Sequence, residues 1–259
     1  MATRPTHAEI HLDRLRHNLR CVRTLVGDHV AIMAIVKANA YGHGGVLCAQ
    51  TFVEEGVEWL GVALPEEGVA LRKAGIDTPI LCLGGFWAGQ EGLVLDFGLT
   101  PAISRVEQLD RLDAAAASRK ITAAIHLKFD TGMGRLGLPL QTADAVFARL
   151  ASCRHLEPSG LMTHIASADM PECDAFTRTQ IAAFDDLVAL AEMRGIRPPL
   201  LHLANGASLH AFPEARGNLV RPGAILYGLR RDILSPAGPE LDVRPVMRFV
   251  TSIVHIKTV

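Results

Sequence analysis

Short apolar runs alternate with amphipathic segments along almost the whole chain, and this alternation constrains the fold more than any other feature. About eight apolar runs have the length of buried strands, near residues 31–36, 59–63, 79–83, 99–102, 122–129, 158–163, 200–203 and 218–226. Most are separated by segments with helical spacing, which indicates β–α repetition. An open doubly wound sheet and a closed barrel share this pattern, but about eight units in roughly 230 residues match the ~250 residues typical of a barrel. We therefore predict an α/β fold, a TIM (β/α)8 barrel.

Helices are predicted between these strands from apolar spacing and from signals at their ends. Ser104 and Glu107 form a capping-box signature for a helix that continues to about Ser118. The other predicted helices are residues 12–25 before Gly27, residues 65–74 between Pro65 and Gly75, and a helix with an apolar face over 181–191 before Gly195.

No internal repeat, low-complexity tract or long linker interrupts residues 11–232, so we predict that they form one barrel domain. Beyond them, Leu234 to Pro239 is predicted to be a connector, and Val246 to Val259 a strand with no helix after it. Residues 233–259 are therefore expected to lie outside the barrel.

Composition excludes several functional classes. A formal net charge of -1 with 20% charged residues argues against a nucleic-acid partner. No apolar run approaches the ~18 residues of a membrane span, and the first residues contain no apolar signal-peptide core, so neither a membrane partner nor secretion is expected. The five cysteines include no C-x-x-C pair, which indicates reduced thiols and a cytoplasmic protein. No metal is expected, because the eleven histidines form no H-x-x-x-H group.

The segment from Ala34 to Gly44 runs an apolar strand into Lys37 and then into a turn of small residues. Partial desolvation at a strand end lowers the pKa of a lysine and frees its amine for attack on a carbonyl. Tyr41 and the following glycines can bind a phosphate through a phenol and backbone N–H groups. The segment thus suggests a Schiff-base lysine that holds pyridoxal phosphate, although taken alone it favours a solvated lysine before an ordinary turn. Its glycines lack the G-x-G-x-x-G spacing of a nicotinamide site.

A barrel gathers catalytic groups at the C-terminal ends of its strands and places phosphate loops after the last two strands. The predicted strand ends carry polar groups in this pattern: Lys37, Lys128 with Asp130 to Arg135, His164, His202 with Asn205 and Gly206, and Arg221 with Gly223. Taken singly, the histidines also fit a packed core and the arginines structural ion pairs. Asp130-Thr-Gly equals an aspartic-protease triplet, but it has no second copy and the α/β pattern contradicts that fold.

Four motifs resemble, in order, the successive signatures of bacterial alanine racemases. They are Lys37-Ala-Asn-Ala-Tyr-Gly-His-Gly, Lys128-Phe-Asp-Thr-Gly-Met-Gly-Arg-Leu-Gly, His202-Leu-Ala-Asn-Gly and Arg221-Pro-Gly. The segment from Arg4 to Leu12 is similar to that family's start, so the likeness covers the whole chain. It implies a cytoplasmic pyridoxal-phosphate enzyme of fold type III that interconverts L-alanine and D-alanine, supplies D-alanine for peptidoglycan and forms a homodimer. It also implies that residues 1–10 and 233–259 belong to a second, β-rich domain.

The resemblance implies catalytic roles for Lys37, Arg135, His164 and Arg221. Lys37 would bind pyridoxal phosphate as a Schiff base and act as acid or base on one face of the substrate Cα. Arg135 would bind the substrate carboxylate and the cofactor phenolic oxygen, and Lys128 matches a lysine that is carbamylated in relatives and orients this arginine. The other implied cofactor-binding residues are Tyr41, Gly206, Gly223 and Ala224 at the phosphate, Arg221 at the pyridine nitrogen with His164, His202 and Tyr41 in its network, and Asn205.

An arginine beside the pyridine nitrogen has a physical meaning of its own. An aspartate there would keep the nitrogen protonated and make the ring a deep electron sink, whereas the fixed positive charge of Arg221 opposes that protonation. The ring then withdraws fewer electrons, which disfavours transamination and suits brief removal and return of a proton. Racemisation also needs a second acid or base on the opposite face.

The sequence departs from this family in two ways. Relatives continue into a β-rich C-terminal domain that provides the opposite-face tyrosine and another phosphate-binding tyrosine, and neither Tyr41 nor Tyr227, the two tyrosines present, matches those positions. Gly206 also replaces a usual serine, which removes one hydroxyl from the phosphate site. We therefore expect a barrel fragment, or a truncated gene product, with impaired racemisation. A non-catalytic pyridoxal-phosphate homeostasis protein and a racemase of another amino acid are the alternatives.

Overall fold

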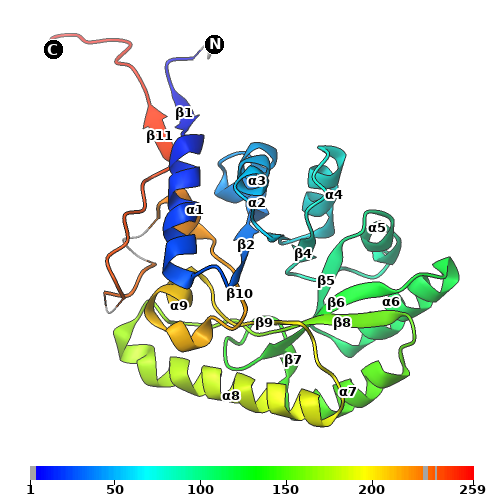
Figure 1. Ribbon diagram of the computed structural model, residues 1–259. Coiled ribbons are helices and arrows are strands. Elements are labelled where there is room, and N and C mark those ends of the chain that lie inside the picture. Colours follow the sequence, from blue (N-terminus) through cyan, green and yellow to red (C-terminus); the bar gives the residue numbers. More distant parts are fainter. Residues whose placement is uncertain (1–3, 230–232, 237) are drawn as a thin grey trace.

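The computed structural model describes residues 4–229, 233–236 and 238–259 and shows a nearly closed barrel of parallel strands (Figure 1). The strand order is β10-β2-β3-β4-β5-β6-β8-β9. The prediction of a (β/α)8 barrel is confirmed. The strands are β2 (Ala31–Ile35), β3 (Trp59–Val62), β4 (Ile80–Cys82), β5 (Thr100–Ile103), β6 (Ala123–Asp130), β8 (Leu156–Met162), β9 (Leu200–His202) and β10 (Leu219–Val220), with β7 (Leu138–Pro139) paired beside β6.

The ends of the sheet meet between β9 and β10. The N–H of Asn218 donates to the carbonyl of Leu201 at 3.1 Å, and the N–H of Arg221 donates to the carbonyl of Ala204 at 3.0 Å. A parallel bridge joins Asn205 and Arg221 just beyond the two strands. Closure therefore brings the loops after β9 and β10 together, and both loops carry predicted site residues.

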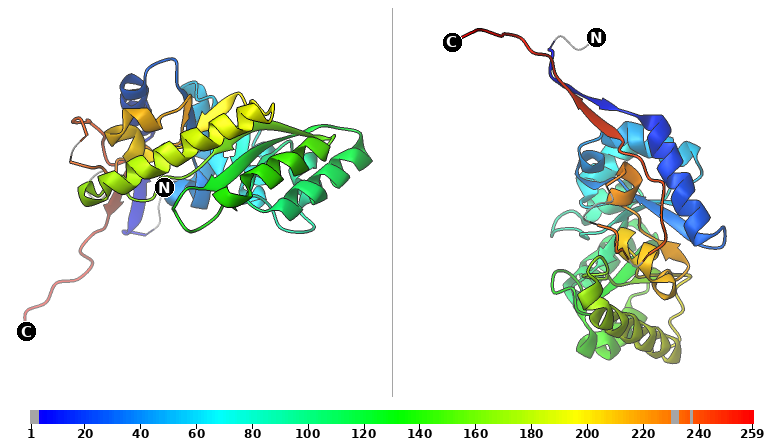
Figure 2. Two further views of the ribbon diagram at one scale, coloured as in Figure 1. Left: turned by 90° about the horizontal axis from the view of Figure 1, so that it is seen from below. Right: turned by 90° about the vertical axis from the view of Figure 1, so that its left-hand side faces the viewer.

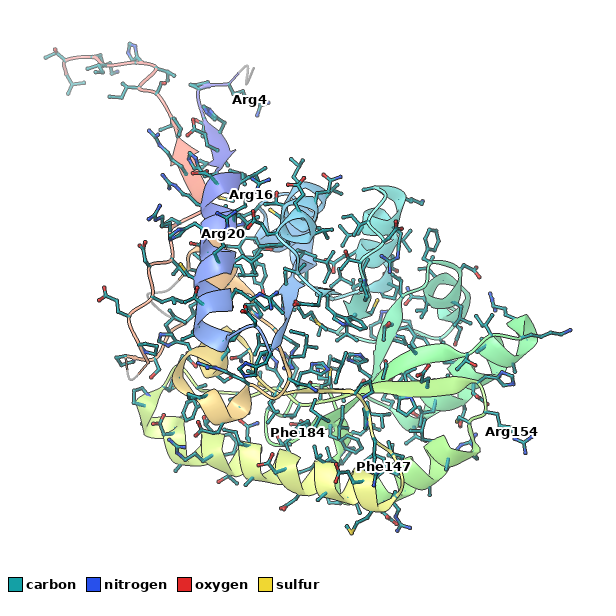
Figure 3. All side chains as sticks on the ribbon, viewed as in Figure 1. Arg4, Arg16, Arg20, Phe147, Arg154 and Phe184 are labelled. Atoms are coloured by element: carbon teal, nitrogen blue, oxygen red, sulfur yellow. The ribbon has the colours of Figure 1, made fainter. Side chains whose placement is uncertain are left out.

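Helices connect successive strands and cover the outside of the barrel (Figure 1). Phe147 and Phe184, on two adjacent helices, are both buried in the layer between helices and sheet (Figure 3). The helices are α1 (Leu12–Val26), α2 (Lys37–Tyr41), α3 (Gly45–Glu54), α4 (Pro65–Lys73), α5 (Glu91–Asp96), α6 (Val106–Arg119), α7 (Ala143–Ser152), α8 (Asp174–Met193) and α9 (Gly206–Ala211), with 3-10 turns η1 (Leu140–Thr142), η2 (Pro171–Cys173), η3 (Pro213–Ala215) and η4 (Ala224–Tyr227).

Side chains of β2 show how the barrel separates two cores. Ile32 and Ala34 belong to the large apolar cluster beneath the helices, whereas Met33 and Ile35 belong to a smaller cluster inside the barrel. This alternation follows from the two-residue period of a strand. The barrel interior is tightly filled, because a Cβ at Gly61 would lie 2.4 Å from Cδ1 of Ile35.

Some predicted elements differ in their bounds. The helix expected to begin at Ser104 begins at Val106 with Arg105 as its N-cap residue. Oε1 of Gln108, in the first turn, accepts the N–H groups of Ser104 and Arg105 at 2.9 and 3.2 Å. The predicted Ser104–Glu107 capping box is therefore wrong by one residue in register. The apolar run 218–226 is mostly not strand, because only Leu219–Val220 form a strand, a single bridge follows at Arg221, and η4 comes after it.

The two ends of the chain form a separate ribbon. β1 (His7–Ile10) pairs antiparallel with β11 (Met247–Val250), and this ribbon projects away from the barrel (Figure 2). The strand predicted to reach Val259 ends at Val250, and residues 251–259 are exposed without regular structure. The assignment of both ends to a second domain stays a prediction, and its boundary near 232 falls on residues outside the described part.

Neither a membrane-spanning helix nor a metal-binding cluster is present in the described residues. No helix within 4–229, 233–236 and 238–259 is long and apolar enough to cross a membrane. The same residues contain no group of three histidine, cysteine or acidic side chains arranged to hold a metal ion.

Candidate functional site

A cavity of about 380 Å³ opens where the C-terminal ends of the barrel strands meet. The predicted site residues that line it are Lys37, Tyr41, Lys128, Arg135, His164, Asn205, Gly206, Arg221, Gly223 and Ala224. His202 does not line the cavity; it is fully buried and contacts Arg221 from behind. The structure thus gathers side chains that are up to 187 positions apart, Lys37 and Ala224, at one end of the barrel.

The backbone that follows Lys37 makes a left-handed helical turn. Ala38, Asn39, Ala40 and Tyr41 have φ values of 50°, 55°, 55° and 53°, a region that residues other than glycine rarely adopt. The N–H of Gly42 donates to the carbonyl of Ala38 at 3.0 Å, which closes the turn. The small side chains before Tyr41 limit the steric cost. As a result, both Lys37 and Tyr41 line the cavity, with Nζ 5.8 Å from the centre of the Tyr41 ring.

Aromatic packing supports this turn from behind. The buried ring of Tyr227 lies 5.0 Å from the Tyr41 ring and 4.7 Å from the His43 ring, measured between centroids. The Tyr227 hydroxyl donates to the carbonyl of Ile35 at 2.9 Å. Tyr227 is therefore a structural residue beneath the site, and its phenol does not reach the cavity.

Two lysines in the cavity lack an acidic partner. Burial, and then the positive charge of Arg135, lowers the pKa of Lys37, while Glu67 opposes this change. Lys128 is 4% exposed, and burial together with Arg221 and Arg135 lowers its pKa to about 8. No hydrogen bond or ion pair engages either ammonium group within the described residues. Each amine is thus more easily deprotonated than an ordinary lysine.

Arg135 is presented by a loop that Asp130 shapes. The Asp130 carboxylate accepts the N–H of Gly132 at 2.9 Å and the N–H of Gly134 at 2.9 Å. It is therefore occupied by backbone donors and forms no ion pair with Arg135. Within the described part of the chain, the exposed Arg135 guanidinium has no hydrogen-bond partner. A planar guanidinium facing a cavity without an internal partner is suited to bind a carboxylate.

Arg221 is a buried cation held mainly by backbone carbonyls. It is 3% exposed, and its guanidinium donates to the carbonyls of Thr163, Leu203 and His202 at 2.7, 2.8 and 2.9 Å. Its Nη2 also lies 3.3 Å from Nδ1 of His164. Burial lowers the pKa of Arg221 to about 9, so the group stays protonated at neutral pH. The bonds fix its place at the base of the cavity.

The arginine sets the tautomers of two histidines behind it. A guanidinium only donates, so Nδ1 of His202, 2.9 Å from Nη1 of Arg221, must accept. The Nε2–H of neutral His202 then donates to Nδ1 of His126 at 2.9 Å. Burial, and then Arg221, lowers the pKa of both rings, that of His126 to about 3 and that of His202 well below its ordinary value. Burial and the same arginine likewise lower the pKa of His164 far below normal, so all three rings are neutral.

Hydrogen-bond donors gather at the other end of the cavity. Gly206, Gly223 and Ala224 line it, and within the described residues none of their backbone N–H groups donates a hydrogen bond. The Tyr41 hydroxyl lies beside them, because a Cβ at Gly223 would be 2.3 Å from it. Only glycine fits there. Donors without acceptors around a small concavity are suited to bind an anion such as a phosphate.

Several cavity residues were missed from the sequence. Asp169 follows β8, and Ala63 and Gly84 follow β3 and β4. All three obey the strand-end rule that found the others, but two are small and apolar, and Asp169 lies several residues beyond its strand. The remaining missed residues are Ile35, Leu83, Leu136, Met162, Ala207 and Ile233.

Comparisons with known proteins agree with this geometry. A family model described as "Alanine racemase, N-terminal domain" matches residues 10–231. The alanine racemase of Geobacter sulfurreducens is 40% identical over 264 residues, which cover 100% of this chain and 68% of that protein. That of Halothermothrix orenii is 39% identical over 259 residues, covering 99% of this chain and 67% of the relative. This chain thus spans about two thirds of the length of such relatives.

Solved structures of alanine racemases are also similar to this chain. The alanine racemase of Clostridium difficile 630 in complex with cycloserine superposes with a TM-score of 0.94 at 32% identity, covering 100% of this chain and 71% of that one. The Bacillus anthracis alanine racemase with bound L-Ala-P gives 0.90 at 30% identity, covering 100% and 67%. Sequence motifs, barrel and matched length therefore lead to one conclusion: the chain belongs to the alanine racemase family.

Proposed function

We propose that this chain binds pyridoxal 5'-phosphate at Lys37 and moves a proton at the Cα of alanine. The observation that carries the proposal is the lining of one cavity, which an unpaired, partly buried lysine shares with a group of residues whose N–H groups are free and with a buried arginine. The relatives support it, because they are named alanine racemases and two solved ones are described with cycloserine or L-Ala-P bound.

The residues present fit this cofactor. When bound, pyridoxal phosphate would supply an aldehyde that condenses with an amine and a ring that withdraws electrons from Cα. The Tyr41 hydroxyl and the N–H groups of Gly206, Gly223 and Ala224 hold the phosphate in this proposal. Lys37 provides the amine and carries the proton to and from one face of Cα, a task that its lowered pKa favours.

Arg221 is proposed to face the pyridine nitrogen. Its charge is fixed by backbone carbonyls, and the three surrounding histidines are neutral, so none of the described residues that bond Arg221 offers a proton-stabilising anion. A cation at this position opposes protonation of the nitrogen and limits how strongly the ring withdraws electrons. Proton removal and return are thereby favoured over side reactions such as transamination.

Lys128 is proposed to carry a carbamate. As an ammonium it is a buried cation near Arg135 and Arg221, which is electrostatically unfavourable. Carbon dioxide adds to an uncharged amine, and a pKa of about 8 makes that form accessible near neutral pH. The resulting anion would attract Arg135 and orient its guanidinium toward the substrate carboxylate.

Among the described residues we assign Lys37 as the acid or base at Cα and no tyrosine to the opposite face. Tyr41 is placed at the donor end of the cavity, and Tyr227 is bonded beneath it. These are the two tyrosines of the sequence. We therefore propose that these 259 residues alone exchange the Cα proton on one face and interconvert the enantiomers poorly.

Arg135 distinguishes the proposed enzyme from a non-catalytic carrier of pyridoxal phosphate. An unpartnered guanidinium in the cavity is expected for binding an amino-acid carboxylate, and a carrier has no use for it. It does not identify the side chain of the amino acid. Alanine is proposed from the relatives.

We further propose that the protein acts in the cytoplasm as a homodimer and that it supplies D-alanine for peptidoglycan. Leu136 lines the cavity and is 44% exposed. Met170 follows the cavity residue Asp169 and is 42% exposed, and Phe176, whose ring lies against Gly132, is 44% exposed. Apolar side chains gathered beside a functional cavity are typical of surfaces that another subunit covers.

The cofactor lysine can be trapped chemically. After incubation with pyridoxal phosphate and reduction with borohydride, we expect the cofactor mass on the peptide that contains Lys37. Lys37→Ala should abolish this label, while Lys73→Ala, at an exposed lysine of α4, should leave it unchanged. Peptide mass spectrometry makes the measurement. Equal labelling of wild type and Lys37→Ala would refute the site.

The charge of Lys128 predicts a pH-dependent stability. The pKa of Lys128 is about 8 in the folded chain and about 10.5 when unfolded, so between these values the unfolded state binds more protons and wild-type stability rises with pH. In buffer free of carbon dioxide, Lys128→Met should be more stable than wild type by about 3 kcal/mol below pH 8, and this advantage should disappear toward pH 10.5. Urea unfolding of both proteins across this pH range measures the difference in the free energy of unfolding. A difference that does not change with pH contradicts the assigned pKa.

One-face proton transfer has an isotopic signature. In D2O, the chain loaded with pyridoxal phosphate should introduce deuterium at Cα of one alanine enantiomer roughly a hundredfold faster than it interconverts the enantiomers, because one of two acid–base groups is lacking. Proton NMR and chiral chromatography measure the two rates, with Lys37→Ala as the inactive control. Equal rates would show that a second acid or base is present.

A further inference from the structure

The left-handed turn from Ala38 to Tyr41 is strained, so contacts with the surrounding structure must stabilise it. Successive non-glycine residues with φ near 50° persist only where neighbouring structure leaves no alternative. The bond between Gly42 and Ala38 lies within the turn itself. The Asn39 side chain accepts the N–H of Gly45 at 2.6 Å and is likewise local. An attachment to a different part of the barrel is therefore of particular interest.

Glu67 makes that attachment. Its Oε1 accepts the N–H of Ala38 at 2.6 Å, and its Oε2 accepts the N–H of Ala63 at 2.7 Å and the N–H of Leu64 at 3.3 Å. Glu67 is the third residue of α4 and reaches back over the start of that helix. One carboxylate thus joins the first residue after Lys37 to the end of the neighbouring strand, β3.

The Tyr227 ring packs against the turn from one side, but packing does not provide the same restraint on the side that faces α4. On the side of the turn that faces α4, a second cavity of about 390 Å³ separates Asn39 and Val46 from Ala70 and Leu71, and Glu67 lines it. Side chains next to open space lack partner atoms that would hold them in place. Hydrogen bonds to a charged acceptor are stronger than neutral ones, so this carboxylate is a suitable tether across the gap.

From this geometry we infer that Glu67 is a positioning residue: its carboxylate fixes the strained turn that directs Lys37 and Tyr41 into the functional cavity. This inference rests on the proposed function, in which Lys37 binds pyridoxal phosphate and Tyr41 its phosphate. Glu67 itself does not line that cavity. Its influence on the chemistry passes through the backbone of Ala38.

Three variants distinguish the effects of the length of the Glu67 side chain, of its charge, and of a general loss of stability. Glu67→Gln keeps the shape but turns one acceptor into a donor, so it cannot accept from Ala38 and from β3 together. Glu67→Asp keeps the charge at the start of α4 but is one methylene shorter. Glu66→Gln is the matched control, because it removes the same charge from the same helical turn, and Glu66 bonds Gln90 rather than the turn.

Hydrogen exchange and cofactor trapping in the full chain test the inference. In Glu67→Gln and Glu67→Asp, backbone amides in the peptide over 38–44 should exchange about tenfold faster, as expected for a lost hydrogen bond to a charged group. Borohydride trapping of pyridoxal phosphate at Lys37 should slow by a similar factor. Peptides from the rest of the barrel, and all peptides of Glu66→Gln, should exchange as in wild type. If Glu67→Gln does not fold, Glu67→Asp, which keeps the helix-start charge, carries the test.

Unchanged exchange over 38–44 and unchanged trapping in a folded Glu67 variant would overturn the positioning role. Faster exchange spread over the whole chain would also overturn it, since that result describes a general structural residue. Failure of the wild-type chain to trap pyridoxal phosphate at Lys37 would refute the proposed function instead, and exchange over 38–44 would still decide whether Glu67 holds the turn.

Discussion

Burial of the Arg221 guanidinium is the constraint on which the site depends. A desolvated cation is costly unless its donors are satisfied, and here carbonyls of Thr163, His202 and Leu203 satisfy them. These carbonyls come from the ends of β8 and β9, so the arginine ties the closing strands of the barrel together. Its donors also force the His202 tautomer, and burial together with its positive charge keeps the surrounding rings neutral. The burial of Arg221 therefore determines both the structure and the electrostatics of the cavity base.

Backbone geometry, rather than a set of charged side chains, shapes the rest of the cavity. The donor end consists of N–H groups at Gly206, Gly223 and Ala224, so the absence of a serine hydroxyl at 206 removes one donor among several. At the lysine, a left-handed turn with an unfavourable backbone conformation places both Lys37 and Tyr41 at the cavity. The uncompensated positive charges of the cavity are consistent with ligands that are anionic at both the phosphate and the carboxylate.

Physical patterns explain which features the sequence could predict. The barrel and the grouping of Lys37, Arg135 and Arg221 followed from strand periodicity, because parallel strands must end at one face. The left-handed turn could not be foreseen, since alanine and asparagine there carry no glycine signal. The cap of α6 was misassigned because the side chains of Glu107 and Gln108 can both accept the N–H of Ser104, and only the fold decides between them. Likewise, the apolar run after Leu219 could form a strand or η4 with equal burial.

The central claim is that a fixed cation, not an acid, faces the ring nitrogen of the bound cofactor. The most direct test is nitrogen-15 NMR of the chain loaded with pyridoxal phosphate labelled at the ring nitrogen. The account predicts the chemical shift of an unprotonated pyridine at neutral pH and no change to a protonated one as the pH is lowered within the range where the chain stays folded. A pyridinium shift at neutral pH would contradict the placement of Arg221 and with it the electrostatic account of this cavity.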